Sequence, residues 1–147
     1  MSTIYPFPPV NNSFDGLTGD VREETEAQME KNWQKIEGWG YHGDAALLSD
    51  ETGATASFTY NGRNFCVWSK RRSDFGVMDI LLDGVSLAKV DLYGIHWPKD
   101  DGYRAAPVYC SAYVERGEHT VTLKAAGEKN PISKGMSVSA DAVEFQK

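Results

Sequence analysis

Short runs of strand-forming residues, separated by glycines and turn-forming pairs, fill most of the chain from Ala54 to Lys124. In the run from Ala54 to Tyr60, apolar residues alternate with Thr and Ser, which gives the run one apolar and one polar face. The runs are 54–60, 65–68, 77–82, 85–92, 108–113, 119–124 and 138–145. Short strands at even spacing predict an all-β fold. Two stacked antiparallel sheets would cover the apolar faces.

Two dipeptides between these runs are typical of tight turns. Asn61-Gly62 separates the first two runs, and Asp83-Gly84 separates the third from the fourth. Asn, Asp and Gly adopt positive φ angles more easily than other residues, as a two-residue hairpin turn requires. Both dipeptides therefore predict a β-hairpin.

The segment before the strands has a different pattern. Pro6, Pro8 and Pro9 disfavour a helix in an extended lead-in. A helix is then expected from Val21 to about Glu30, with Asp20 as its N-cap. We therefore divide the chain into a lead-in with a short N-terminal helix, 1–31, and a sandwich, 32–147. The stretch 33–39 could also open the sandwich as a strand.

Composition excludes several classes of protein. The 147 residues are 41% hydrophobic, which suits one domain with a sizeable core. A formal net charge of −6 argues against nucleic acid as a partner. No apolar stretch is long enough to span a membrane, and the first residues lack the pattern of a signal peptide. We expect an extracellular or virion-associated protein, either released without such a leader or cut from a longer exported chain.

Cysteines and acidic residues offer little evidence for a metal site. Cys66 and Cys110 both fall inside predicted strands, and we favour buried free thiols over a disulfide. No zinc-binding spacing is present. Asp44, Asp50 and Glu51 could supply oxygen ligands to a structural calcium ion, although acids in a loop are more often solvated. No other cofactor is expected.

Several ordered strings resemble one known group of proteins. They are Gly53 to Gly62, Gly76 to Gly84, Val90 to Tyr93, Gly117 to Leu123, Lys129 to Pro131 and Ser139 to Val143. Together they resemble the galactose-binding-like jelly-roll modules that are appended to bacterial glycoside hydrolases and carbohydrate esterases, where they act as carbohydrate-binding modules. The resemblance runs from about Trp33 to Phe145 and implies a jelly-roll β-sandwich. We interpret the matching Asp91, Asn130 and Asp141 as acceptors of backbone N–H groups at the bases of loops.

The sequence does not point to catalysis. The Gly-x-Ser-x-Gly signature of many serine hydrolases is absent. Asp100 and Asp101 are adjacent, which does not give the opposed carboxylates that glycoside hydrolysis needs. His119 lies in a strand pattern and is interpreted as structural. We expect no catalytic residues, although the chain could accompany a catalytic domain of a larger enzyme.

The leading hypothesis is therefore non-catalytic binding of a polysaccharide or other glycan. Flat aromatic rings stack on the apolar face of a sugar, and polar side chains bind its hydroxyls. The candidate platform residues in loops are Trp39, Tyr41, Trp97 and Tyr103. The candidate polar residues are His42, Arg71, Arg72, His96 and Asn130. Burial of the loop aromatics as lid packing stays open as the alternative, and Trp33 and Trp68 are expected in the core.

A second hypothesis is a structural or adhesive role. A jelly-roll component of a phage tail, virion or other extracellular assembly would leave the cell without a signal peptide. The segment 1–36 would then attach the sandwich to a larger polypeptide or form a homo-oligomer.

Overall fold

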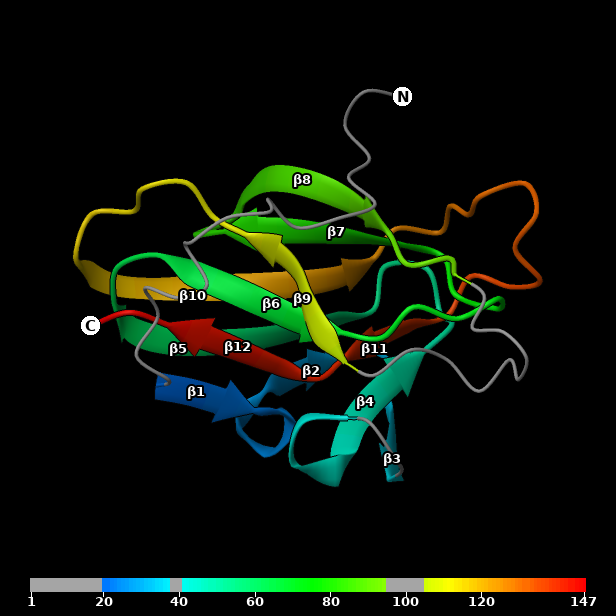
Figure 1. Cartoon of the computed structure of the whole chain (residues 1–147), viewed down its shortest axis with the longest axis horizontal. Helices are drawn as coiled ribbons and strands as arrows, with labels where there is room; N and C mark the ends of the chain where they lie inside the picture. The colour runs from blue at the N-terminus through cyan, green and yellow to red at the C-terminus, as the bar shows by residue number, and fades with distance from the viewer. Residues whose placement is uncertain (1–19, 38–40, 95–104) are drawn as a thin grey trace.

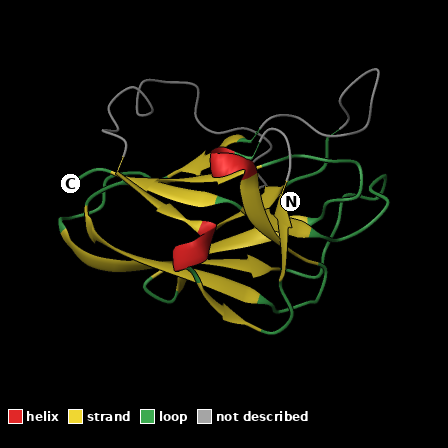
Figure 2. Cartoon of the chain, turned by 90° about the horizontal axis from the view of Figure 1, so that it is seen from below, coloured by secondary structure: helices red, strands yellow, loops and turns green. Residues whose placement is uncertain are grey.

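The structure, a computed structural model of the chain, describes residues 20–37, 41–94 and 105–147. Strands dominate these residues, and the helical pieces among them are two short 3-10 turns, as Figure 2 also shows. In chain order the elements are β1 (Asp20–Glu23), η1 (Glu24–Glu26), β2 (Gln28–Glu30), β3 (Gln34–Glu37), η2 (His42–Asp44), β4 (Ala45–Ser49), β5 (Thr55–Gly62), β6 (Phe65–Ser69), β7 (Val77–Leu82), β8 (Val85–Asp91), β9 (Ala106–Cys110), β10 (Gly117–Ala125), β11 (Val138–Ala140) and β12 (Ala142–Phe145). None of the described helical pieces is long and apolar enough to cross a membrane.

The strands form three antiparallel sheets. One has the order β2-β5-β10-β7-β8, the second β1-β12-β6-β9, and the third, smaller one β11-β4-β3. In Figure 1 the strands β6, β9 and β12 are drawn over β10 and β5, and β3 and β4 lie at the lower right. The predicted antiparallel β-sandwich is therefore confirmed.

The core lies between the two larger sheets. Strand alternation directs Ala56, Phe58 and Tyr60 of β5 inward, and these three residues are buried, whereas Thr59 is exposed. Val121 and Leu123 of β10 join them in the same cluster. Burial of one face of each strand supplies the main stabilising free energy of such a fold.

One of the two predicted hairpins is present. Asp83 and Gly84 both have positive φ, 50° and 85°, and Leu82 pairs with Val85 across the turn between β7 and β8. The turn at Asn61-Gly62 was a wrong prediction, because β5 runs through Gly62 and pairs with β10 and β2. The following strand, β6, belongs to the other sheet and pairs with β12 and β9.

The predicted helix from Val21 to Glu30 is also wrong. The segment forms β1, one 3-10 turn and β2. Asp20, the predicted N-cap, begins β1 instead, and the capping box that is present is formed by Glu23 and Glu26 and covers only η1. β1 pairs with β12 and β2 pairs with β5, so these backbone groups are satisfied by the two larger sheets rather than by a helix.

The cysteines form a disulfide, which corrects the expectation of free thiols. The register of β6 and β9 places Cys66 directly opposite Cys110, with a Cα–Cα distance of 4.1 Å. The residues are 44 positions apart, and only the pairing of β6 with β9 brings them together. The bridge therefore joins two neighbouring strands of one sheet.

Loops gather at one end of the sandwich, at the right in Figure 1. The segment after β6 is hydrogen-bonded to two others there. The Arg72 N–H donates to the Leu92 carbonyl at 3.0 Å, and the Gly76 N–H donates to the Ser137 carbonyl at 2.8 Å. The segments after β6, β8 and β10 thus form one connected layer beside the sheet of β11, β4 and β3.

Candidate functional site

The structure places five of the nine predicted ligand-binding residues. Tyr41, His42, Arg71, Arg72 and Asn130 are described, and Trp39, His96, Trp97 and Tyr103 lie outside the described residues. The first four of the described residues follow β3 or β6, and Asn130 lies in the segment after β10.

Tyr41 does not offer a free ring face. The residue is only 7% exposed, and the ammonium of the buried Lys70 lies 4.2 Å from the ring centroid. Burial raises the pKa of the Tyr41 hydroxyl to about 12, which the nearby Arg72 partly opposes. The ring therefore packs in the interior and supports a buried cation there.

His42 belongs to a network of buried and half-buried charges. Its Nδ1 lies 2.7 Å from Oε2 of Glu23, and its backbone N–H donates to Oδ2 of Asp141 at 2.8 Å. The ring also packs edge-on against Trp68, with the centroids 5.2 Å apart. Burial raises the pKa of Asp141 to about 8, although the bond from His42 lowers it. His42 is thus committed to contacts within the protein.

Asp91, Asn130 and Asp141 have the structural role that the sequence predicted. Asp91 accepts the Tyr93 N–H at 2.9 Å, Asn130 accepts the Ile132 N–H at 3.2 Å, and Asp141 accepts from His42. Asn130 also donates its side-chain amide to Asp91 at 3.0 Å. These bonds fix loop conformations.

The arginines are half-buried in the segment after β6. Arg72 Nε lies 3.3 Å from Oδ1 of Asp74, and its guanidinium lies over the ring of Phe75, 5.6 Å from the centroid. Its backbone bonds to the segment after β8, as described above. Arg71 is half-buried beside it. Arg72 therefore ties the segments of this end together.

The three acids that were considered as calcium ligands lie in separate positions and do not share one site. Glu51 accepts from the side-chain amide of Asn32 at 2.8 Å. Asp44 ends η2 with a φ of 63°, and Asp50 is exposed directly after β4. Within residues 20–37, 41–94 and 105–147, no group of three or more His, Cys, Asp or Glu side chains is placed to hold a metal ion.

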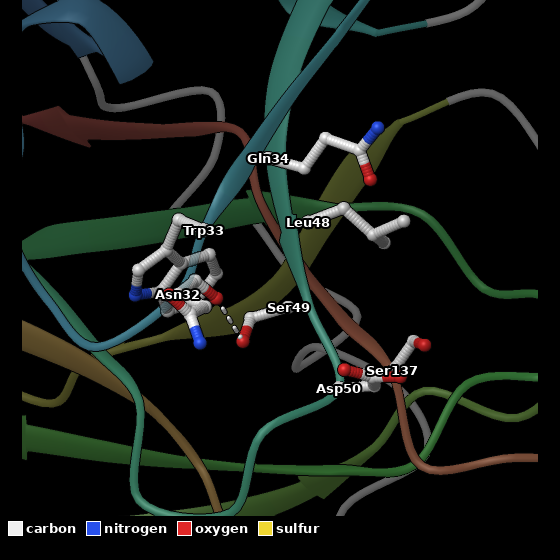
Figure 3. A pocket seen from close by; sticks show the side chains of 7 residues that line it. All are labelled: Asn32, Trp33, Gln34, Leu48, Ser49, Asp50 and Ser137. Carbon is white, nitrogen blue, oxygen red and sulfur yellow. Dashed lines mark hydrogen bonds between the residues drawn. The ribbon is translucent and has the colours of Figure 1, made fainter.

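A pocket of about 220 Å³ lies on the small sheet, beside strands β3 and β4 (Figure 3). Antiparallel pairing explains its lining, because Gln34 pairs with Leu48 and Val138 pairs with Ser49. The pocket therefore lies where β3 begins, β4 ends and β11 begins. The residues lining the pocket are Asn32, Trp33, Gln34, Leu48, Ser49, Asp50 and Ser137.

Trp33 supplies the apolar wall of this pocket. The side chain is half-buried and packs against the core. Its indole N–H donates to the Glu30 carbonyl at 3.1 Å, which fixes the ring. Figure 3 shows Trp33 beside Asn32 on one side of β4. A fixed, partly exposed indole is a surface on which a flat apolar ligand face can stack.

Polar side chains complete the pocket. Ser49 Oγ donates to the Asn32 carbonyl at 2.7 Å and accepts from the Glu51 N–H at 3.2 Å, so this hydroxyl is already used. Asn32 uses its amide N–H on Glu51 and keeps its side-chain oxygen as an acceptor. Gln34 and Asp50 are exposed, and Ser137 is half-buried. The pocket therefore offers acceptors and an amide beside an apolar wall.

Sequence reasoning assigned Trp33 to the core and did not identify it as a residue that lines a pocket. The residue does contact the core, so that expectation is partly right. Its neighbours carry the signal that was not used, because Asn32 and Gln34 place hydrogen-bonding amides on both sides of an aromatic residue at the start of a strand. Asp50 and Ser137 join them only through the pairing of β4 with β11.

Comparisons with known proteins agree with the fold. No protein-family model matches the chain. A family 35 carbohydrate-binding module from Clostridium thermocellum superposes with a TM-score of 0.61 at 12% identity, over 88% of this chain and 99% of that one. The CBM36-1 domain of a multidomain xylanase, from the hindgut metagenome of Trinervitermes trinervoides, gives 0.60 at 12% identity, over 86% and 95%. The resemblance to jelly-roll carbohydrate-binding modules is thus confirmed for the fold.

Enzymes also contain similar domains. An exo-β-1,3-galactanase from Phanerochaete chrysosporium gives a TM-score of 0.58 at 15% identity, over 86% of this chain and 29% of that one. One curated protein, an A type blood α-D-galactosamine galactosaminidase from Flavonifractor plautii, is 27% identical over 92 residues. That match covers 63% of this chain and spans only 8% of the length of the galactosaminidase.

Proposed function

We propose that this chain is a non-catalytic carbohydrate-binding module that holds one saccharide unit in the pocket of β3 and β4. The observation that carries the proposal is a surface pocket that the fixed indole of Trp33 lines together with hydrogen-bonding side chains. A sugar has an apolar C–H face and a rim of hydroxyls, which match an aromatic wall and polar partners.

The size of the pocket sets the size of the ligand. Its volume of about 220 Å³ is smaller than the roughly 300 to 1,000 Å³ of pockets that take drug-sized ligands. One sugar ring, at the end or on a branch of a glycan, suits it better than an extended chain. Affinity is expected to be modest, because water already binds the hydroxyls of the free sugar well.

The similar proteins support a saccharide ligand. Two of the similar folds are named as carbohydrate-binding modules, and the matched segment of the galactosaminidase lies in a protein named for its action on a sugar. Those names describe those proteins. The Cys66–Cys110 disulfide supports the proposal that the module works outside the reducing cytosol.

Affinity gel electrophoresis on a panel of polysaccharides, with a glycan array on the intact chain, tests the proposal. Trp33→Ala should reduce retardation by roughly tenfold or more, because the stacking surface is lost. Tyr113→Ala is the matched control, since Tyr113 is 75% exposed and does not line the pocket. Melting curves show whether Trp33→Ala stays folded, and Gln34→Ala changes an exposed pocket residue that does not pack against the core.

Three outcomes would overturn the proposal. The first is that the unmodified chain binds no glycan on the array. The second is that folded Trp33→Ala and Gln34→Ala bind as well as the unmodified chain. The third is that Trp97→Ala abolishes binding while both pocket variants keep it, which would move the site to the loop aromatics predicted from the sequence.

A further inference from the structure

The pocket of β3 and β4 has an uneven distribution of charge. Among the described residues that line it, Asp50 carries the one formal charge, and it is exposed at the end of β4. Gln34 and Ser137 are neutral, and the N–H of the Trp33 indole is already bound to a carbonyl. A ligand in this pocket therefore meets a carboxylate and no lining cation.

Glu51 and two lysines are the next charges along the strands that line the pocket. Glu51 is held beside the pocket, because its Oε1 accepts from both the side-chain amide of Asn32 at 2.8 Å and the Asn32 backbone N–H at 3.4 Å. One of the lysines, Lys31, donates to the Thr52 carbonyl at 3.3 Å, on the turn that follows Glu51. The other lysine, Lys35, lies 4.0 Å from Oε2 of Glu24. Both ammonium groups thus have partners outside the pocket, whereas Asp50 lines it.

Glu51 and Asp50 differ in what they can still bind. Glu51 already accepts two hydrogen bonds at one oxygen, whereas no hydrogen bond or ion pair to Asp50 is formed by the other described residues. A carboxylate that accepts from a charged donor forms a stronger hydrogen bond than one that accepts from a neutral hydroxyl. Asp50 is therefore the position at which the charge of a ligand changes its affinity most.

We propose that this pocket selects a glycan unit with a free, protonated amino group, whose ammonium binds Asp50 while the ring stacks on Trp33. This inference rests on the proposed function and names the ligand class of the same pocket. The same charge disfavours sugars that carry a carboxylate or sulfate group, because like charges repel across a few ångströms. N-acetylation removes the ammonium charge and so removes the preference.

Matched pairs of saccharides test this selectivity. Isothermal titration calorimetry would compare chitosan oligosaccharides with their N-acetylated counterparts, and galactosamine with N-acetylgalactosamine, galactose and galacturonate. The unmodified chain should bind at least one amino sugar roughly tenfold or more tightly than its N-acetylated form. Added salt should reduce this ratio, because the pair is near the surface.

Two variants separate the charge from the rest of the pocket. Asp50→Asn keeps the shape of the side chain and should bring the ratio of the two dissociation constants close to one. Glu118→Gln removes an equivalent charge from an exposed site on β10, outside the pocket, and should leave the ratio unchanged.

The outcomes distinguish this inference from the proposed function. If neutral or N-acetylated sugars bind Trp33-dependently and as tightly as amino sugars, the selectivity is wrong and glycan binding stands. If Asp50→Asn keeps the full ratio of the two dissociation constants, the role of Asp50 is wrong, while the preference for amino sugars stands. If no saccharide of any charge binds, both proposals fail together.

Discussion

His119 on β10 lies 2.7 Å from Asp83 in the β7–β8 turn, measured from Nδ1 to Oδ2. The other ring nitrogen, Nε2, lies 2.7 Å from the Glu115 carbonyl. Both partners are oxygen acceptors, so the doubly protonated ring satisfies both at once. The hydrogen bond to Asp83 raises the pKa of His119, with burial opposing it. The structural role expected for His119 is therefore confirmed.

The first prediction is a fall in stability as the pH rises above 6.5, the ordinary pKa of histidine. A raised pKa of His119 in the folded state means that its contribution is complete below the ordinary value of 6.5 and is lost as pH rises through the higher folded value. The effect should be on the order of 1 kcal/mol or less in the free energy of unfolding, because the pair is partly exposed. Thermal melting in a pH series that starts below 6.5 and rises stepwise measures it.

Asp83→Asn is the informative variant for this pair. Asn tolerates the positive φ of the turn and can still accept the Thr120 N–H, so it removes the charge and keeps the turn. Burial alone would raise the pKa of Asp83, but the bonds from His119 and Thr120 outweigh it and lower that pKa. The charge of Asp83 therefore stabilises the folded state at pH values above 3.8, its ordinary pKa. This stabilisation is lost as the pH falls through the lower pKa of the folded state. An equally steep loss of stability with rising pH in Asp83→Asn would contradict the assignment.

The second prediction concerns Asp141, which is fully buried. Its pKa is raised to about 8, mainly by burial and also by Glu23 and Glu24, while the His42 N–H and Lys70 act in the opposite direction. The folded state then holds a proton that the unfolded state has lost above its ordinary value of 3.8. The free energy of unfolding should therefore decrease as the pH rises from the lower to the higher of these two pKa values. The decrease is up to about 1.4 kcal/mol per pH unit for a single proton.

Asp141→Asn should flatten that part of the pH profile. Asn keeps an acceptor for the His42 N–H but does not titrate. In the described part of the chain, Oδ1 of Asp141 is buried without a hydrogen-bond partner, so something must neutralise the carboxyl. The same melts with millimolar calcium and with a chelator provide the control. A calcium-dependent rise in the melting temperature that Asp141→Asn abolishes would show that a cation, and not a proton, occupies this position.

Local sequence patterns predicted the strands well because alternation and turn chemistry act over a few residues. Asp83-Gly84 could be recognised as a hairpin turn since both residues have the positive φ that the turn needs. Asn61-Gly62 carries the same kind of signal, but its glycine serves a different purpose. A Cβ at Gly62 would collide with the carbonyl of Gln146, so close approach to the end of the chain requires glycine there.

The remaining features depend on pairings between distant segments. Val21 to Glu30 has the spacing of a helical stripe, yet β12 and β5 supply partners for its backbone and tertiary pairing overrides local propensity. The pocket likewise depends on β4 lying between β3 and β11. The sequence analysis placed Trp33 in the core and treated Asp50 as a possible calcium ligand, because no local pattern shows that three separate segments bring Trp33, Asp50 and Ser137 together.

The third prediction concerns the disulfide between β6 and β9. Cys66→Ala with Cys110→Ala should lower the free energy of unfolding by about 2 to 4 kcal/mol, because the bridge restricts the unfolded chain across a separation of 44 residues. Urea unfolding of the double variant, and of the unmodified chain with and without a reductant, measures the loss. The reduced chain should match the double variant. Identical midpoints for oxidised and reduced protein would contradict a formed bridge.

The last prediction separates two glycines that look alike in the sequence. Gly84 has a φ of 85° and no atom within 4 Å of the position that a Cβ would take, so Gly84→Ala should cost about 1 to 2 kcal/mol from the left-handed conformation alone. Gly62 does not have a positive φ, but its Cβ would also lie 3.0 Å from the Phe145 ring, so Gly62→Ala should cost about 3 kcal/mol through overpacking. Asn substitutions distinguish the causes, because Asn tolerates positive φ. In urea unfolding, Gly84→Asn should recover most of the stability that Gly84→Ala loses. Gly62→Asn should unfold at least as easily as Gly62→Ala. Equal behaviour of the two sites would refute the difference argued for them.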